Sequence, residues 1–428
     1  MNARDTALAV LIACRRDGAW ADGALKQQLA RDRLDRRDAA LATRLVYGVL
    51  QNRLLLDHWL APFLRGKLQP VVQDILRLAV YQLRLMDKIP ANAAVNEAVE
   101  QAKRQANPKA AGLVNAVLRN LLRGEQTLPE DLSLRYSHPR PLVALLREAV
   151  GEDRLEALLQ SHNRTPETAI QVNTTLATAA AVLERLNEEG LDAAPHPWLP
   201  DCLLLSGGSV EGSAAYRDGL FYVQDPAARL AVLAAELRPG LRVLDCCAAP
   251  GGKSFAAAIA MENRGEITSC DLHAHKIALI EKGAARLRLD CIRALQQDAR
   301  AVRPEWRGQF DAVLCDVPCS GLGVIRKKPD IRYKDLAPLE ALPTIQLDIL
   351  RTQADYVKPG GVLVYSTCTI LPRENEGVIA AFLQERSDYA PEAFTLPGGI
   401  AGPDGMKTLL PCEEDTDGFF ICKLRRHS

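Results

Sequence analysis

The chain has 428 residues, of which 48% are hydrophobic and 25% are charged, a composition typical of globular proteins and a length that favours two or three domains. No apolar run approaches the roughly 18 residues of a membrane-spanning helix, and the first residues lack the apolar core of an export signal. A cytoplasmic protein is therefore expected. The 11 cysteines include no C-x-x-C pair, so we expect neither a metal site nor a disulfide framework. A functional cysteine would act as a thiol.

Charge is distributed unevenly along the chain. Lys plus Arg and Asp plus Glu each total 53, so the formal net charge is zero, yet residues 1–123 hold 20 basic and 11 acidic residues, a net charge of +9. The surplus includes Arg15, Arg16, Arg31, Arg33, Arg36, Arg37, Lys103, Arg104, Arg119 and Arg123. Two interpretations stay open at this point, a solvated helical face and a surface that binds a polyanion.

Residues 1–125 are predicted to form an all-helical domain. The three-and-four spacing of one helical face recurs in Val72, Ile75, Leu76, Ala79, Leu83 and Met86. Asp38 is a candidate cap for the helix that follows it, and Pro90 and Pro108 stand where helices are expected to begin. The pattern is that of a helical bundle.

The remaining chain is predicted to hold two further domains. Residues 126–220 read as linker helices and a small α/β subdomain, and residues 221–428 as a larger α/β domain. In the larger domain, helical segments alternate with short strand-like runs at 241–246, 265–271, 291–298, 310–316 and 361–367. Such alternation is typical of a parallel sheet with helices on both faces. The last apolar run, residues 418–424, lacks a following helix and is predicted as an added edge strand.

The segment LDCCAAPGGKS, residues 244–254, is the strongest local motif. A strand meets a glycine-containing loop that opens a helix, an arrangement that lets a ligand approach backbone N–H groups at the helix start. A phosphate-binding Walker loop would need glycine where this chain has Cys247, and Pro250 stands inside the loop. The dinucleotide motif G-x-G-x-x-G is absent as well, so a different ligand is indicated.

Three acidic residues follow successive predicted strands. Asp271 comes directly after the second strand, 20 residues beyond Gly251, and is placed to accept hydrogen bonds from ribose hydroxyls. Asp298 and Asp316 are predicted at the ends of the third and fourth strands, with Asp298 placed to meet an adenine edge. Because the carboxyl ends of parallel strands share one edge of a sheet, the three acids are expected to line one crevice.

Two cysteines stand out among the eleven. Cys319 lies in DVPCSG, just beyond a predicted strand, and Cys368 lies in YSTCT, just beyond the next one. A lone cysteine is more often a small core residue than a reactive thiol. Cys319 and Cys368 stand in loops beside polar residues, which argues against a core position for either. Both side chains are expected to reach the crevice.

The blocks LDCCAAPGGKS, CD at 270–271, QD at 297–298, DVPCSG and STCT occur in the order seen in the RNA cytosine-5 methyltransferases of the Nop2/Sun group, which residues 124–428 resemble. The N-terminal domain is similar to the NusB RNA-binding fold. The resemblance implies a Rossmann-like methyltransferase domain with a mostly parallel seven-stranded sheet, an RRM-like α/β insert and 16S ribosomal RNA as partner. Lys328 and Gln171 stand where the group commonly has His and Arg.

The resemblance further implies S-adenosylmethionine as methyl donor and a role for each site residue. The donor would be held by Cys247, Ala248, Ala249, Pro250, Gly251, Gly252, Lys253, Asp271, Asp298 and Asp316. Carbon 5 of cytosine is too electron-poor to attack a methyl sulfonium, so a thiolate must first add to carbon 6. Spacing alone does not decide which thiol attacks. The resemblance implies Cys368 as nucleophile and Cys319 as the residue that assists release. Asp316 in protonated form, beside the apolar Val317 and Pro318, is a candidate stabiliser of the ring.

Two alternatives and two further expectations accompany this interpretation. A NusB-like RNA-binding or transcription factor would hold a ligand without turnover. An amino-group methyltransferase would need an aromatic residue in the block DVPC, where this chain has Cys319. No metal is expected at the site, and nothing in the sequence requires more than a monomer.

Overall fold

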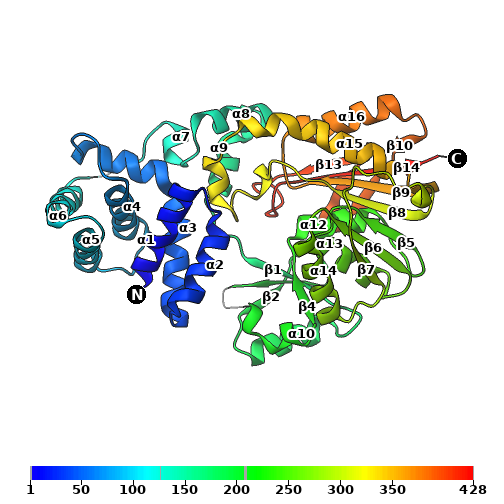
Figure 1. Ribbon diagram of the computed structural model, residues 1–428, viewed down its shortest axis with the longest axis horizontal. Coiled ribbons are helices and arrows are strands. Elements are labelled where there is room, and N and C mark those ends of the chain that lie inside the picture. Colours follow the sequence, from blue (N-terminus) through cyan, green and yellow to red (C-terminus); the bar gives the residue numbers. More distant parts are fainter. Residues whose placement is uncertain (1, 126, 207–209, 428) are drawn as a thin grey trace. The chain divides into compact units, whose positions relative to one another are not determined.

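The computed structural model of the chain describes residues 2–125, 127–206 and 210–427. It divides into two compact units, of which unit 1 comprises Met1–Arg164 with Ile325–Asp335 and unit 2 comprises Thr165–Val324 with Leu336–Ser428. Figure 1 labels elements of both units where there is room. Among the described residues, no helix is long and apolar enough to cross a membrane. The predicted domain ranges 1–125, 126–220 and 221–428 stay predictions.

Unit 1 is helical, as the sequence predicts for its N-terminal part. Its helices are α1 Ala3–Asp17, α2 Ala21–Asp32, α3 Arg36–Leu60, α4 Pro70–Leu85, α5 Ala91–Gln105, α6 Pro108–Arg123, α7 Leu132–Arg135, α8 Arg140–Val150 and α9 Glu152–Ser161, with 3-10 turns η1 Ala61–Phe63 and η5 Pro329–Tyr333. Pro90 and Pro108 do mark helix starts. The predicted cap Asp38 is wrong, because Asp35 is the N-cap of α3 and its carboxylate accepts the Asp38 N–H.

Helix α3 is bent at Asn52, whose backbone angles are not helical. The bend frees backbone groups of the preceding turn, and these need other partners because they are buried. The Leu55 N–H donates to the Ser137 hydroxyl at 3.0 Å instead of to the helix. The carbonyls of Leu50 and Gln51 accept hydrogen bonds from the segment 325–335, which thereby becomes part of the unit 1 core.

Polar side chains of the segment 325–335 are buried inside unit 1 and bonded to its backbone. Arg332 is only 1% exposed, and its guanidinium donates to the carbonyls of Gln51, Tyr136 and His162 at 2.7, 3.1 and 2.9 Å. The Tyr333 hydroxyl donates to the Leu50 carbonyl at 2.8 Å. Asp330 accepts the Ala21 N–H at 3.0 Å and so caps α2, whose own N-cap residue makes no side-chain bond.

Two buried histidines adjoin Arg332. The rings of His138 and His162 are hydrogen bonded to each other at 3.1 Å. Burial and the positive charge of Arg332 lower the pKa of both well below the usual value, so both are neutral near pH 7. Burial also lowers the pKa of Arg332, to about 10, which leaves the guanidinium charged under the same conditions.

We expect Arg332→Ala to destabilise unit 1 by about 1–3 kcal/mol or more, because the buried Gln51 carbonyl loses its donor and a cavity is created. Arg332→Lys should recover part of this loss, since an ammonium cannot reproduce the planar fork of a guanidinium. Hydrogen exchange of the α3 amides measures the effect. The exposed neighbour Lys328 is the control, and Lys328→Ala should change protection by less than about 0.5 kcal/mol. Equal losses in the two alanine variants would contradict the role of Arg332.

Unit 2 begins with a small sheet. Its strands β1 Thr168–Val172, β2 Ala193–Pro195, β3 Cys202–Leu205 and β4 Phe221–Val223 pair antiparallel in the order β2-β3-β1-β4, with helices α10 Ala179–Glu188 and α11 Ala214–Arg217. This is the α/β insert that the sequence predicts. Gln171 is 2% exposed and donates to the Gln224 carbonyl at 3.2 Å, so it has a structural partner inside the unit.

The main sheet of unit 2 is mostly parallel. Its strands are β5 Arg242–Asp245, β6 Glu266–Asp271, β7 Ile292–Gln296, β8 Phe310–Asp316, β9 Val357–Thr367, β10 Tyr389–Pro391, β13 Met406–Leu409 and β14 Phe419–Arg426. Strands β5 to β9 run parallel in the order β9-β8-β5-β6-β7. A separate hairpin consists of β11 Phe394–Leu396 and β12 Ile400–Gly402.

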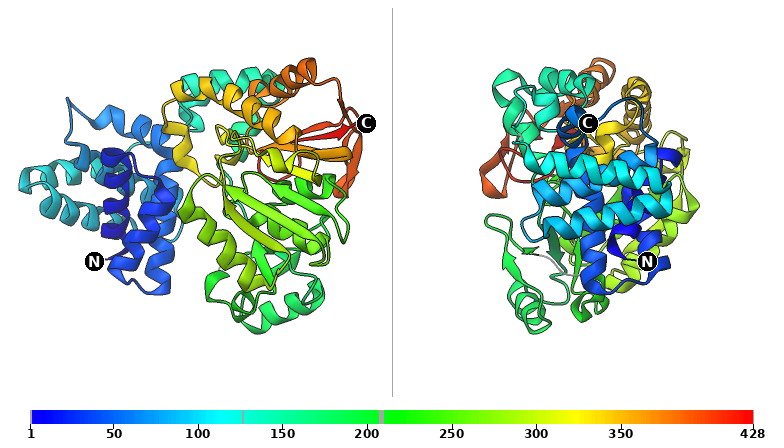
Figure 2. Two further views of the ribbon diagram at one scale, coloured as in Figure 1. Left: turned by 45° about the vertical axis from the view of Figure 1, so that its right-hand side comes forward. Right: turned by 90° about the vertical axis from the view of Figure 1, so that its left-hand side faces the viewer.

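Helices cover both faces of this sheet (Figures 1 and 2). Successive residues of one strand alternate between the two cores, as Val243 and Leu244 do. The first core includes α12 Pro226–Ala234, α13 Gly252–Ala260 and α14 Ala274–Leu287, and the second includes α15 Leu342–Ala354 and α16 Glu376–Glu385.

The sheet departs from the sequence prediction at its antiparallel end. Residues 418–424 were expected to form an edge strand, but β14 lies inside the sheet between β9 and β10. Strand β13 also pairs with β14, which makes eight strands where seven were expected. The short strands β10 and β13 have too little periodicity in the sequence to be recognised.

Candidate active site

The predicted crevice would lie where the parallel strands end. Strand β5 has β6 on one side and β8 on the other, so the chain that follows β5 lies where the strand order reverses, the usual ligand site of such sheets. Asp245, Asp271 and Asp316 are the last residues of β5, β6 and β8, and Cys368 directly follows β9. The strand order therefore brings Asp271, Asp316 and Cys368 to one sheet edge, together with Asp245.

The loop from Cys246 to Gly251 connects β5 to α13. The Ala248 N–H donates to the Cys270 carbonyl and the Gly251 N–H to the Ala248 carbonyl, both at 2.7 Å, so the loop is held against β6. Gly251 has φ +114°, and a Cβ there would lie 2.3 Å from the Phe255 ring. Only glycine fits this position. The first N–H groups of α13 have no partner within the helix and are available to a ligand.

The two predicted ligand acids beyond this loop differ in their surroundings. Asp271 has a side chain 8% exposed, accepts the His273 N–H at 3.1 Å and lies 3.6 Å from the Lys276 ammonium. Asp298 does not end its strand as predicted, because β7 stops at Gln296. Asp298 accepts the backbone N–H of Arg300, and the Arg300 guanidinium holds the pKa of Asp298 below its usual value.

Lys253, at the start of α13, is ion paired with Asp316. The Lys253 ammonium lies 2.7 Å from an Asp316 oxygen, and the Ser366 hydroxyl donates to the other oxygen at 2.8 Å. Burial on its own lowers the pKa of Lys253, but Asp316 and then Asp245 outweigh burial and raise that pKa above its usual value. From the sequence, Asp316 was expected in protonated form and buried. Its side chain is instead 29% exposed and faces the Lys253 ammonium.

Asp245 is a site residue that the sequence analysis missed. Its carboxyl is fully buried and accepts the Ser254 hydroxyl at 2.7 Å, and Ser254 in turn contacts the Ser269 hydroxyl at 2.7 Å. Burial raises the pKa of Asp245 to about 7. The signal was available, since Asp245 ends its strand as Asp271 and Asp316 end theirs.

The two thiols singled out in the sequence lie together. The Sγ atoms of Cys319 and Cys368 are 3.2 Å apart, although the residues are 49 positions apart in the chain. The following residues are linked as well, since the hydroxyls of Ser320 and Thr369 lie 2.7 Å apart. The Gly323 N–H donates to the Cys368 carbonyl at 3.0 Å. The loops after β8 and β9 are therefore joined to each other.

The charges around the two thiols differ. The hydrogen bond to Cys368 and burial, followed by the charges of Cys368 and Glu374, raise the pKa of Cys319 well above its usual value. Cys368 interacts with a positive charge instead. A negative charge on Cys368 is one of the interactions that raise the pKa of Lys253, after those with Asp316 and Asp245. The Lys253 ammonium thus interacts with Cys368, whereas Glu374 interacts with Cys319.

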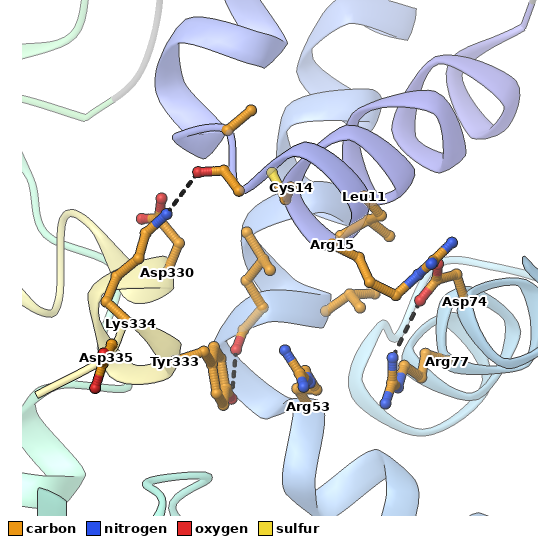
Figure 3. A pocket seen from close by; sticks show the side chains of 14 residues that line it. Leu11, Cys14, Arg15, Arg53, Asp74, Arg77, Asp330, Tyr333, Lys334 and Asp335 are labelled. Carbon is orange, nitrogen blue, oxygen red and sulfur yellow. Dashed lines mark hydrogen bonds and ion pairs between the residues drawn. The ribbon is translucent and has the colours of Figure 1, made fainter. Parts of the chain in front are cut away.

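A pocket of about 350 Å³ lies in unit 1, between α1, α3, α4 and the segment 325–335 (Figure 3). Asp74 accepts hydrogen bonds from Arg15 and Arg77, and the Arg53 guanidinium stacks on the Tyr333 ring at 4.4 Å. Much of the charge in this pocket is paired internally. The pocket contains none of the predicted catalytic or donor-binding residues.

The basic residues of unit 1 divide into paired and unpaired groups. Arg15, Arg16, Lys103 and Arg104 form ion pairs with Asp74, Asp17, Glu100 and Asp5. Four exposed arginines around the junction of α2 and α3 form no ion pair within the described residues: Arg31, Arg33, Arg36 and Arg37. The described residues also contain no group of three or more His, Cys, Asp or Glu that could hold a metal ion.

Comparisons with known proteins match the whole chain. Family models match residues 232–425 as 16S rRNA methyltransferase RsmB/F, 1–123 as NusB family and 138–211 as the ferredoxin-like domain of RsmF/B-like methyltransferases. The chain is 39% identical to the probable ribosomal RNA small subunit methyltransferase B of Bacillus subtilis, over 99% of both chains.

Solved structures share the fold. The crystal structure of PH0851 has a TM-score of 0.82 at 24% identity and covers 98% of both chains. NSun6 from Pyrococcus horikoshii with SFG has a TM-score of 0.59 at 22% identity and covers 68% of this chain and 98% of its own. Because sequence, domain order and fold agree over nearly the full length, this chain belongs to the family of 16S rRNA methyltransferases RsmB/F.

Proposed function

We propose that this chain transfers a methyl group to carbon 5 of a cytidine in 16S ribosomal RNA, through a covalent bond between Cys368 and carbon 6 of the base. The observation that carries the proposal is the pair of thiols 3.2 Å apart at the ends of neighbouring parallel strands. Family membership makes the chain an RNA methyltransferase with S-adenosylmethionine as methyl donor. The target nucleotide expected for the family is cytidine 967.

The residues at the strand ends fit S-adenosylmethionine. The donor, when bound, supplies the methyl group as an electrophilic sulfonium. Backbone groups of Cys247 to Gly252 would hold its amino-acid end, in a loop whose conformation and close contact with the Phe255 ring require glycine at 251. Asp271, nearly buried at the end of β6, would accept hydrogen bonds from the ribose hydroxyls. Asp298 would meet the adenine amine.

The reaction needs a nucleophile and then a base. The Cys368 thiolate forms a bond to carbon 6, and the displaced electron pair moves to carbon 5, which takes the methyl group. The Cys319 thiolate then removes the proton from carbon 5. The electron pair of that bond re-forms the double bond between carbons 5 and 6, and the bond from carbon 6 to the Cys368 sulfur breaks. Before this step the proton of the Cys319 thiol passes to solvent water, because a bonded Cys368 no longer carries the charge that opposes ionisation.

Lys253 and Asp316 act as a pair in this scheme. The Lys253 ammonium stabilises a thiolate at Cys368, and Asp316 orients the ammonium at 2.7 Å. We propose this ion pair in place of the protonated Asp316 expected from the sequence. A carboxylate bound to an ammonium accepts hydrogen bonds and has no proton to donate to the base.

The roles of the thiols predict opposite results for two variants. Cys368→Ala should form no covalent RNA adduct, whereas Cys319→Ala should form an adduct that persists on a denaturing gel, because release is blocked. Cys291→Ala, at the start of β7, is the control and should behave as the parent. The reverse pattern would exchange the two roles. Undiminished methylation by the variant that lacks both thiols would instead indicate direct transfer to an amino nitrogen, which needs no covalent step.

The ribose role of Asp271 predicts weaker donor binding. Asp271→Asn should raise the dissociation constant for S-adenosylmethionine by about 10- to 100-fold, since a hydrogen bond to a charged group contributes about 1.5–3 kcal/mol. Calorimetry measures this constant directly. RNA affinity should not change, and the exposed Asp290→Asn is the matched control. An unchanged donor affinity in Asp271→Asn would remove this residue from the site.

We further infer that the exposed arginines around the junction of α2 and α3 bind RNA phosphates. Unpaired surface cations bind a nucleic acid irrespective of its sequence, which would hold the RNA while a cytosine leaves its stack. Removing residues 1–123 would be a poor test, because Ile325–Asp335 completes unit 1 and follows directly on the Cys319 loop. Substitutions avoid that problem. The cytoplasmic location and monomeric state stay predictions.

The double variant Arg36→Gln with Arg37→Gln should weaken RNA binding and flatten its salt dependence. The slope of log affinity against log salt should fall by about 1.5, since each phosphate contact contributes about 0.7–0.9. Filter binding between 50 and 200 mM salt gives the slope. Lys103→Gln with Arg104→Gln removes the same charge from ion-paired residues and is the control. Unchanged slopes in both variants would favour a solvated face without RNA contact.

A further inference from the structure

We propose that the buried carboxylate of Glu374 is a positioning residue that holds the Cys319 loop and, by its negative charge, keeps Cys319 in the thiol form until Cys368 has reacted. This inference rests on the proposed roles of the two thiols and extends them. It concerns the residue that would make Cys319 and Cys368, whose sulfurs lie 3.2 Å apart, differ in how readily they ionise.

Glu374 lies behind the Cys319 loop and is fully buried at the end of the 3-10 turn η7 Pro372–Glu374. One carboxylate oxygen accepts the Ser320 N–H at 2.9 Å and the Gln346 side-chain amide at 2.9 Å. The same amide nitrogen of Gln346 donates to the Pro318 carbonyl at 3.0 Å. Glu374 and Gln346 thus hold the residues on both sides of Cys319.

The backbone of Glu374 is anchored to the neighbouring strand. Its carbonyl accepts the hydroxyl of Tyr365, a buried residue of β9, at 2.6 Å. Strand β9 ends one residue before Cys368. The contacts of Glu374 therefore connect the loop of one thiol to the strand of the other, and a shift of this side chain would change the distance between the sulfurs.

Glu374 has no cationic partner among the described residues. No ion pair to Glu374 occurs within the described ranges, and its second oxygen is buried without a hydrogen-bond donor there. The titratable groups that interact with Cys319 are Cys368, Glu374 and Tyr365. Two of these can be negative near Cys319, whereas Lys253 acts on Cys368. The two thiols therefore have different charged neighbours.

The order of ionisation follows from what changes during the reaction. The negative charge of Cys368 disappears once its sulfur has bonded to carbon 6, whereas Glu374 takes no part in bond formation. Glu374 therefore sets how strongly Cys319 retains its proton at every stage. Without that charge, Cys319 would ionise earlier and would compete with Cys368 as nucleophile or repel its thiolate.

The test measures the ionisation of Cys319 without RNA or donor. In a Cys368→Ala background, the full-length protein is treated with iodoacetamide over a range of pH, and alkylation of Cys319 is followed by peptide mass spectrometry. Adding Glu374→Gln keeps the side-chain shape and removes the charge. The midpoint of the alkylation profile should move down by about one pH unit, so that Cys319 reacts about 10-fold faster below the midpoint.

The control removes a carboxylate that lies in the same segment but does not interact with the Cys319 thiol. Glu376 is exposed and bonded to the Thr408 hydroxyl, so Glu376→Gln should leave the alkylation profile unchanged. An unchanged profile in Glu374→Gln would overturn the charge role. A shift of equal size in both variants would also overturn it, because a general charge effect would then explain the result.

The positioning role is tested by turnover. Glu374→Ala should lower kcat at least about 10-fold with little change in KM for S-adenosylmethionine, because the Cys319 loop loses its anchor while the donor loop is intact. Glu374→Gln should restore most of that loss in kcat. Parent-like turnover of Glu374→Ala would overturn the positioning role. Because the alkylation profile uses neither RNA nor donor, its outcome is independent of whether the covalent mechanism proves correct.

Discussion

The parallel pairing of β8 with β9 is the interaction on which the candidate site depends. In this register Asp316 faces Ser366, so the loops that leave the two strands begin side by side. That alignment brings the sulfurs of Cys319 and Cys368 to 3.2 Å, and it also places the Ser366 hydroxyl on Asp316. A slip of one residue would turn the side chains to the opposite face of the sheet and separate the thiols. Backbone hydrogen bonds between strands therefore supply the geometry of the chemistry.

The chain between the two thiols also serves the helical unit. After Cys319 it passes Gly323, whose N–H binds the Cys368 carbonyl, and then enters unit 1, where Arg332 is buried among backbone carbonyls. A buried guanidinium without a carboxylate is costly unless its donors are used, and here the bent helix α3 provides a carbonyl that needs a donor. The segment 325–335 thus makes unit 1 complete, and unit 1 gives that segment a defined conformation.

Buried acids distinguish this site from an ordinary sheet edge. Asp245 and Glu374 are fully enclosed, one behind the donor loop and the other behind the Cys319 loop. Neither contributes to the hydrophobic core, and each is held by hydroxyl, amide or backbone donors. Such groups are expensive to bury, and they occur where a carboxyl has to be retained at a defined position. Asp245 adjoins the proposed donor loop, and Glu374 contacts the loop of Cys319, a proposed catalytic residue. These positions favour a functional reason for their burial.

Much about this protein is determined by local sequence alone. Helical spacing and proline positions indicate the N-terminal helices, strand-like runs indicate the parallel sheet, and the blocks around Gly251, Cys319 and Cys368 indicate the family, because each signal lies within a few neighbouring residues. Other features depended on residues distant in the chain. The ion pair of Lys253 with Asp316, the insertion of β14 inside the sheet, the burial of Arg332 and the two contacts of Glu374 join segments that no periodicity connects. Only the tertiary structure decides such contacts, because charge state and burial depend on what the rest of the chain brings near a residue.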